Sequence, residues 1–143
     1  MADAIVEPIR FSKWKGQSGL EQFIIEQTGC KAFSGAGITP RIAKKTTILK
    51  SVDDTYYYDD DMTDICNPKY TLFGHNGDQS ETEKKFNEPL LNANKTEHIY
   101  LYRVKKMEYL WYGKYIIVGK YEKLHQGKDR ITRTIVVLHL KRV

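Results

Sequence analysis

The sequence predicts a single α+β domain whose core is a strongly curved sheet or β-barrel flanked by a few helices. Three observations predict this architecture. Helix-like patterns occur only early and in the middle of the chain, strand-like runs fill its last third, and no repeat, low-complexity run or linker interrupts the 143 residues. We therefore expect one domain, 1–143, with an N-terminal helical segment, 1–34, and a barrel core, 35–143.

The first helix is expected in SGLEQFIIEQTG, residues 18–29. Ser18 can cap its start and Gly29 can end it. Its apolar stripe comprises Leu20, Phe23 and Ile24. The glycine-rich SGAGITP that follows predicts a loop ending at Pro40.

Two strands are expected in the middle of the chain. The β-branched run TTILKSV, 46–52, predicts a strand, and Tyr56–Tyr58 predicts its continuation or another short strand. NPKYTLFG predicts a turn at Asn67-Pro68 and a strand through Phe73.

A second helix is predicted over DQSETEKKFN, 78–87. Asp78 at its cap and Glu81 three residues later resemble a capping box, and Pro89 limits or kinks the helix. The remaining strands are predicted in HIYLYRV, in YLWYGKYIIVGKYEKL with a bend at Gly113, and in RTIVVLHLKRV after the turn HQGKDR.

Composition and charge restrict the class of protein. A hydrophobic fraction of 41% with 29% charged residues is that of an ordinary globular protein. Cys30 and Cys66 are too few for a disulfide framework or a zinc pattern. Neither a secretory signal nor a membrane-spanning run is visible, so we expect an intracellular protein, cytoplasmic or nuclear, with no membrane contact. The net charge of +5 favours an anionic partner.

The residue patterns of common enzymes are not found in the sequence. The four histidines lack metal-ligand spacing, and SGAGITP lacks the lysine of a phosphate-binding loop. The acidic run Asp59–Asp61 is by itself a weak indication of a metal site, because such runs are usually solvated turns. We therefore expect no catalysis by this chain, no cofactor and no bound metal.

The segment YYYDDDMTDICNPKYT, 56–71, places tyrosines beside carboxylates within a basic chain. A nucleobase taken out of a duplex needs aromatic faces on both sides and polar groups on its Watson–Crick edge. Cytosine offers an amino donor, for which a carboxylate is the natural acceptor. The segment is therefore a chemically sensible cytosine pocket, although tyrosines in strands are more often half-buried packing residues.

Five stretches together resemble the SRA domain, also called YDG, a reader of modified cytosine in DNA. They are YDDD, KYTLFGHNGDQ, FNEPLL, YLWYGKYIIVGKYEK and VVLHLKRV, and the resemblance covers roughly residues 35–143. Gly-Asp-Gln after the tyrosine-containing strand is familiar from microbial modification-dependent restriction enzymes. The resemblance implies a crescent-like, PUA-like β-barrel, modified double-stranded DNA as partner, and a nuclease that is a separate protein.

The resemblance also implies roles for four residues. The family's Tyr-x-x-Asp matches Tyr58 and Asp61, and its Tyr-Thr matches Tyr70 and Thr71. The two tyrosines are then expected to sandwich the flipped base, Asp61 to accept from its amino group, and Thr71 to lie by the pocket wall. Candidates for the pocket rim are Tyr56, Tyr57, Asp60 and His75.

The sequence departs from the family pattern in several places. Tyr56 and Tyr57 stand where eukaryotic members usually have two glycines, and Pro89 stands where a small helical residue is common. The loop after Gly74 is too short for the finger that replaces the flipped base in those members. Tyr112-Gly113-Lys114-Tyr115 occupies the place of the family's Tyr-Asp-Gly.

Surface lysines are the candidate phosphate contacts: Lys44, Lys45, Lys84, Lys85, Lys105 and Lys106. Such contacts give salt-dependent affinity without sequence information. The stretch Gly74–Gln79 can also present backbone amides to a phosphate at a helix start, although helix capping by Asp78 and Gln79 is the preferred interpretation.

The favoured interpretation is a DNA-binding module that recognises a 5-methyl- or 5-hydroxymethyl-type cytosine by base flipping. Three alternatives stay open. The first is an RNA-binding PUA-like barrel. The second is a small magnesium-dependent nuclease using Asp59, Asp60, Asp61 or Asp78. The third is a protein-interaction module without a nucleic-acid role.

Overall fold

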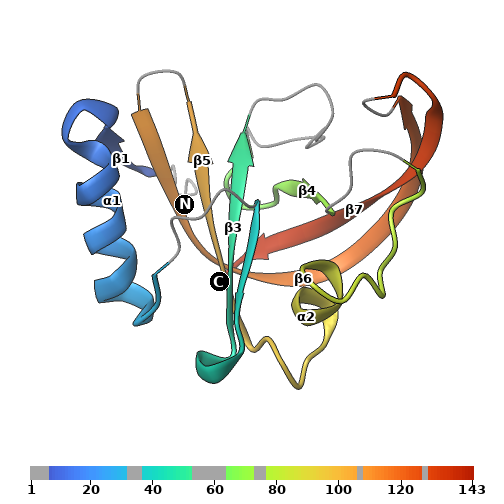
Figure 1. Ribbon diagram of the computed structural model, residues 1–143. Coiled ribbons are helices and arrows are strands. Elements are labelled where there is room, and N and C mark those ends of the chain that lie inside the picture. Colours follow the sequence, from blue (N-terminus) through green and yellow to red (C-terminus); the bar gives the residue numbers. More distant parts are fainter. Residues whose placement is uncertain (1–6, 32–36, 53–63, 73–76, 106–107, 127–128) are drawn as a thin grey trace, which may run out of the picture.

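The computed structural model describes residues 7–31, 37–52, 64–72, 77–105, 108–126 and 129–143, with the side chains of 13–18 excepted. Within these residues it has a seven-stranded sheet and two α-helices (Figure 1). The helices are α1 (Lys13–Thr28) and α2 (Asn87–Leu91), and a 3-10 turn, η1, spans Ile42–Lys44. The strands are β1 (Ile9–Ser12), β2 (Ile38–Arg41), β3 (Thr46–Val52), β4 (Lys69–Thr71), β5 (His98–Val104), β6 (Glu108–Gln126) and β7 (Thr132–Arg142).

The sheet runs in the order β2-β3-β5-β6-β7-β4, and β1 pairs with the start of β6. All neighbouring strands are antiparallel except β3 and β5, which are parallel. The described strands leave the sheet open between β2 and β4. The predicted strongly curved α+β sheet is therefore confirmed, while backbone pairing does not close it into a barrel among the described residues.

β6 carries most of the curvature. Its first part pairs with β5 and its second part with β7, and the register shifts once beside Gly113, at φ +113°, and once at Val118. Such bulges bend a strand and increase its twist. In Figure 1 the outer ends of β6 and β7 consequently project at the right of the view as a hairpin, away from β3 and β5.

Apolar clusters cover both faces of the sheet. Neighbouring residues of β3 point to opposite faces, so Ile48 packs beneath α1 and Leu49 packs within the curve of the sheet. On the face of α1 that packs against the sheet, Leu20 and Ile24 are fully buried. Burying each of these side chains stabilises the fold by about 1.5–3 kcal/mol. Leu90 of α2 belongs to the cluster within the curve.

Several predicted elements are confirmed. The run 46–52 is β3, and the three late strands are β5, β6 and β7. Gly29, at φ +71°, ends α1, and its N–H donates to the Ile25 carbonyl. The bend at Gly113 is also found.

Other predictions are wrong or fall on residues that the structure does not describe. Ser18 does not cap a helix, because α1 begins at Lys13 and Ser18 lies inside it. Pro40 lies within β2, an edge strand in which a missing N–H is tolerated. The predicted strand Tyr56–Tyr58 lies outside the described residues, as does Phe73, and β4 ends at Thr71. β1 was not predicted.

The predicted helix over 78–87 is also wrong. Residues 78–80 have no regular secondary structure, residues 81–86 lie largely in turns, and α2 begins only at Asn87. The local signature of Asp78 and Glu81 fails because Asp78 and Gln79 bond to β7 instead. No helix among the described residues is both long and apolar enough to span a membrane.

Candidate nucleic-acid interface

Tyr70 and Thr71 lie on β4, where backbone pairing places them opposite Leu138 and Val137 of β7. Both side chains are buried, with 3% and 2% of their surface exposed. The Tyr70 hydroxyl reaches across the open edge of the sheet. It donates to the carbonyls of Lys50 at 3.0 Å and Gly37 at 2.9 Å, sharing its single hydrogen between them. Tyr70 thereby joins β4 to β3 and to the residue before β2.

The described residues that flank segment 53–63 on either side are tied to the sheet. The segment leaves β3 after Val52 and returns at Asp64. Just beyond its end, the Ile65 carbonyl accepts from the Tyr115 hydroxyl at 2.5 Å, and the Cys66 carbonyl accepts from the Arg142 N–H at 2.8 Å. Burial raises the pKa of the Tyr115 hydroxyl, which donates this hydrogen bond.

This segment contains most of the predicted base pocket. Tyr58 and Asp61, with the rim candidates Tyr56, Tyr57 and Asp60, lie outside the described residues, and His75 does too. Of the four residues of the predicted pocket, the structure therefore describes Tyr70 and Thr71.

Gly77–Gln79 add to the free edge of β7 beyond β4. The Asp78 carboxylate accepts from the Thr134 N–H at 2.8 Å. The Gln79 side-chain amide both accepts and donates a hydrogen bond. Its oxygen accepts from the Val136 N–H at 2.8 Å, and its nitrogen donates to the Leu72 carbonyl at 2.6 Å. These side chains thus pair with the edge of β7 rather than cap a helix, so the capping interpretation is wrong, and residues 74–76 of the other, phosphate-binding interpretation lie outside the described residues.

We call these contacts the β4 seam, meaning Asp64–Leu72 and Gly77–Gln79 together with their partners at Gly37 and Lys50. Segments 53–63 and 73–76 both enter or leave the sheet within it. The partners of Asp78 and Gln79 on β7 lie more than fifty positions away in the sequence, so no local pattern indicated this arrangement. Burial also lowers the pKa of the Lys50 ammonium group.

The topology separates the candidate phosphate contacts. Parallel pairing sets Val52 beside Val104, so Lys105 lies at the end of β3 from which segment 53–63 departs. Lys44 and Lys45 precede the other end of β3, roughly 25 Å away at the usual rise per strand residue. Lys45 pairs there with Glu97 at 3.4 Å. Lys106 lies outside the described residues.

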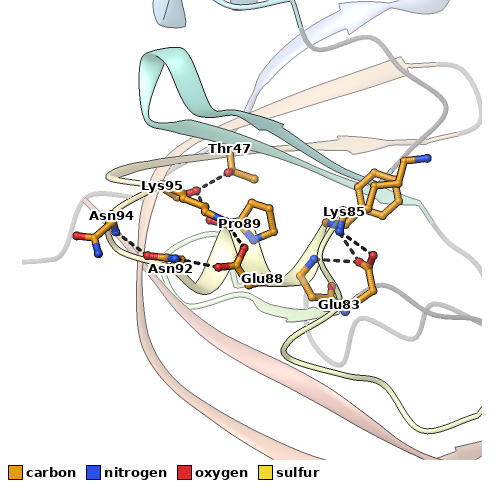
Figure 2. Close-up of polar contacts among 11 residues, drawn as sticks. Thr47, Glu83, Lys85, Glu88, Pro89, Asn92, Asn94 and Lys95 are labelled. Atoms are coloured by element: carbon orange, nitrogen blue, oxygen red, sulfur yellow. Dashed lines mark hydrogen bonds and ion pairs between the residues drawn. The ribbon is translucent and has the colours of Figure 1, made fainter.

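Lys84 and Lys85 lie beside α2 rather than in the β4 seam, and both are exposed. The Lys85 ammonium group is 5.2 Å from the centre of the Phe86 ring. Figure 2 shows the polar contacts of this region, in which Glu83 accepts backbone N–H groups at the start of α2 and Lys95 pairs with Glu88 at 2.8 Å.

Within the described part of the chain, no three His, Cys, Asp or Glu side chains gather as metal ligands would. Asp78 is engaged by the backbone of β7. The other acids of the nuclease alternative, Asp59, Asp60 and Asp61, lie outside the described residues.

Comparison of this chain with known proteins identifies its fold. No family model and no curated protein matches the chain. Among solved structures, the sulfur-binding and SRA domains of ScoMcrA complexed with phosphorothioated DNA match with a TM-score of 0.62 at 18% identity, over 98% of this chain and 40% of that one. The SRA domain of SUVH5 complexed with methylated CHH DNA matches with a TM-score of 0.61 at 21% identity, over 85% and 83%.

A third match is the modification-dependent restriction endonuclease TagI, with a TM-score of 0.58 at 16% identity, over 96% of this chain and 50% of that one. The chain therefore has the fold of SRA domains, as the motifs implied. It spans less than half the length of the ScoMcrA chain and half that of TagI.

Proposed function

We propose that the chain is a DNA-binding module that recognises a modified cytosine of the 5-methyl or 5-hydroxymethyl class. The shared fold carries this proposal, because structures with that fold include complexes with methylated, hydroxymethylated and phosphorothioated DNA. The matching order of Tyr58, Asp61, Tyr70 and Thr71 supports it from the sequence.

In the proposed complex the base is flipped into a pocket between Tyr58 and Tyr70. The hydrogen bonds of the Tyr70 hydroxyl to the carbonyls of Lys50 and Gly37 support the role of Tyr70, since they hold its ring in one orientation. The ring then loses little conformational entropy when a base stacks on it. Asp61 accepts from the cytosine amino group. Stacking and this hydrogen bond offset the free-energy cost of unpairing and unstacking the base, which is roughly a few kcal/mol.

The module binds without cutting, and cleavage, where it follows, belongs to a separate nuclease. The ScoMcrA chain described as a phosphorothioation-dependent restriction endonuclease and the TagI endonuclease are matched over 28% and 50% of their lengths, so half or more of each endonuclease lies outside the shared fold, which supports cleavage by a part other than this module. Its place of action is inside the cell, where modified DNA is found.

The test is binding of the chain to matched duplexes that carry cytosine, 5-methylcytosine, 5-hydroxymethylcytosine or its glucosylated form. We expect a preference of at least about tenfold for one modified duplex, about 1.4 kcal/mol, which Asp61→Ala removes. Asp64→Asn is the matched control, because it removes a nearby negative charge while keeping the oxygen that accepts from the Cys66 N–H. Equal binding to every duplex would contradict base recognition.

The same assay decides among the alternatives. Stronger binding to a matched RNA favours the RNA-binding barrel, since only RNA offers 2′-hydroxyls. Cleavage that magnesium starts and a chelator stops favours the nuclease. Indifference to every oligonucleotide and to salt favours the protein-interaction module.

A further inference from the structure

The second half of β6 has an open edge. β5 pairs with β6 only as far as Tyr115, and from there to Gln126 the described strands accompany β6 on one side alone, where β7 lies. In Figure 1 this part of β6 follows the outer side of β7 at the right of the view. An edge of this kind is a template for pairing with a further strand.

The backbone contacts of β7 show which groups this edge presents. Thr134 and Val136 turn their N–H and carbonyl groups toward the β4 seam. Because successive residues of a strand direct these groups to opposite edges, Ile135 turns its own toward β6, where the register sets it beside Lys123. Lys123 therefore bonds to β7, and Glu122 before it directs its N–H and carbonyl groups outward.

Three exposed residues of β6, Lys120, Glu122 and Leu124, thus direct their backbone groups away from β7. Within the described part of the chain, no backbone partner meets them there. Glu81 reaches the Lys120 ammonium group, but that exposed ion pair contributes little and involves no backbone group of β6. The edge can therefore accept another strand.

An apolar groove lies beside the start of this edge, with a volume of about 240 Å³. Its apolar walls include Leu90, Leu91, Tyr115 and Ile117. Ile117 and Leu124 lie on the same face of β6, because their partners on β7, Leu140 and Thr134, are an even number of positions apart. Val118, at the bulge, is 54% exposed, and Leu124 is 70% exposed. One face of the edge thus carries both a hollow and a protruding apolar side chain.

We propose that this edge joins two copies of the chain, with β6 antiparallel to β6 about a two-fold axis beside Tyr121. Lys120 of each copy then faces Glu122 of the other, which gives two cross-strand pairs of opposite charge. Each pair also exchanges two backbone hydrogen bonds, since both residues direct their groups to the edge. Leu124 of each copy comes beside Val118 of the other, next to the groove. The contact is therefore self-complementary, as a two-fold interface requires.

Charge selects this register. Sliding one copy by two residues sets Glu122 opposite its own counterpart in one direction and Lys120 opposite its own in the other, and like charges directly opposite each other are destabilising. The contact involves one strand and a small groove, so the dimer is weak and forms at high protein concentration. It is independent of the proposed recognition of modified DNA.

The test is sedimentation velocity of the full chain, free of nucleic acid, from about 5 to about 500 µM. We expect wild type to pass from monomer to dimer over this range. Lys120→Glu and Glu122→Lys each place like charges in both cross-strand pairs and should weaken the dimer at least about tenfold. Their equimolar mixture should dimerise again, because each pair then has opposite charges. Glu26→Lys on α1 is the control, since it makes the same charge change as Glu122→Lys away from the edge, and should behave as wild type.

Two further measurements test the contact without charge variants. Leu124→Ser should weaken the dimer about three- to tenfold, because the exposed side chain is covered only in the dimer. Hydrogen exchange of the wild type at rising concentration should show protection appearing at the amides of Lys120 and Glu122. The amide of Lys123, which bonds to β7, should be protected at every concentration.

The outcomes decide the proposal. A wild type that stays monomeric to about 500 µM overturns it, as does a dimer that neither charge variant weakens. Loss of the dimer in both variants without recovery in their mixture overturns the two-fold register. Species larger than a dimer overturn it too, since a two-fold contact closes on itself. Recovery in the mixture supports it and cannot arise from a folding defect in either variant.

Discussion

In the β4 seam most side-chain contacts join residues that are far apart in the chain, whereas around α2 most join near neighbours. Gln79 bonds to Val136 across 57 positions, and Tyr70 bonds to Lys50 across 20. In the α2 segment, Ser80–Thr96, the contacts of Glu83 and Glu88 span 2 to 7 positions. Longer ties also leave that segment: the hydroxyls of Thr47 and Thr96, 2.7 Å apart, join it to β3, and the ion pair of Glu81 with Lys120 joins it to β6.

This difference indicates how each region becomes ordered. The α2 segment can form its turns locally, because their partners are already close in the sequence. The β4 seam can form only when β3, β6 and β7 are in place, since those strands supply its partners. Losing one seam side chain should therefore affect both the stability of the fold and the placement of segments 53–63 and 73–76. Losing one polar side chain near α2 should have a smaller and more local effect.

The largest effect is expected from Gln79→Ala. It leaves the buried Leu72 carbonyl and Val136 N–H without the side chain that bonds both, at a cost of about 2–4 kcal/mol. Denaturant unfolding measures this loss, and faster hydrogen exchange at Val136 would locate it. The matched variant Asn92→Ala removes contacts to Glu88 and Asn94 and should cost no more than about 1 kcal/mol. Equal losses in the two variants would refute the contrast between the regions.

A smaller loss is expected from Tyr70→Phe. The variant keeps the buried ring but removes the hydroxyl that joins β4 to Lys50 and Gly37, at a cost of about 1–2 kcal/mol. If the hydroxyl also orients the ring toward a base, the preference for modified duplex should fall as well. Tyr100→Phe is the control, because its hydroxyl makes no hydrogen bond within the described part of the chain. Unchanged stability and preference in Tyr70→Phe would mean that the hydroxyl does not hold the seam.

The same contrast explains what the sequence could predict. β3 was found from a run of β-branched residues, and α1 was found from its apolar stripe and Gly29, because these signals are local. The helix over 78–87 was a false prediction, because Asp78 and Glu81 match a capping box locally while Thr134 and Val136 decide the outcome from β7.

For the candidate site, the resemblance to SRA domains led to the right fold and assigned Tyr70 and Thr71 to a base pocket, which stays a prediction. It could not reveal that the Tyr70 hydroxyl crosses the open edge of the sheet, since neither Gly37 nor Lys50 carries any sequence mark of that contact. Nor could it separate Lys105 from Lys44 and Lys45. Only the parallel pairing of β3 with β5 places them at opposite ends of one strand.

The smallest effect concerns Glu83, whose carboxylate accepts from the N–H groups of Lys85, Phe86 and Asn87 at the start of α2. Burial alone would raise the pKa of Glu83, but these hydrogen bonds outweigh it and lower the pKa below its ordinary value. The stabilisation is therefore present above the unfolded-state pKa and is lost as the pH falls through the folded-state value. Glu83→Gln should cost about 0.5–1 kcal/mol at neutral pH.

At about pH 3 the difference in unfolding free energy between wild type and Glu83→Gln should shrink, because the wild-type carboxyl is then largely protonated. Glu97→Gln serves as the control, since its exposed ion pair with Lys45 should contribute little at either pH. A gap between wild type and Glu83→Gln that is constant across pH would show that the carboxylate charge does not stabilise this turn. The α2 segment would then depend on packing of Leu90 rather than on its local polar contacts.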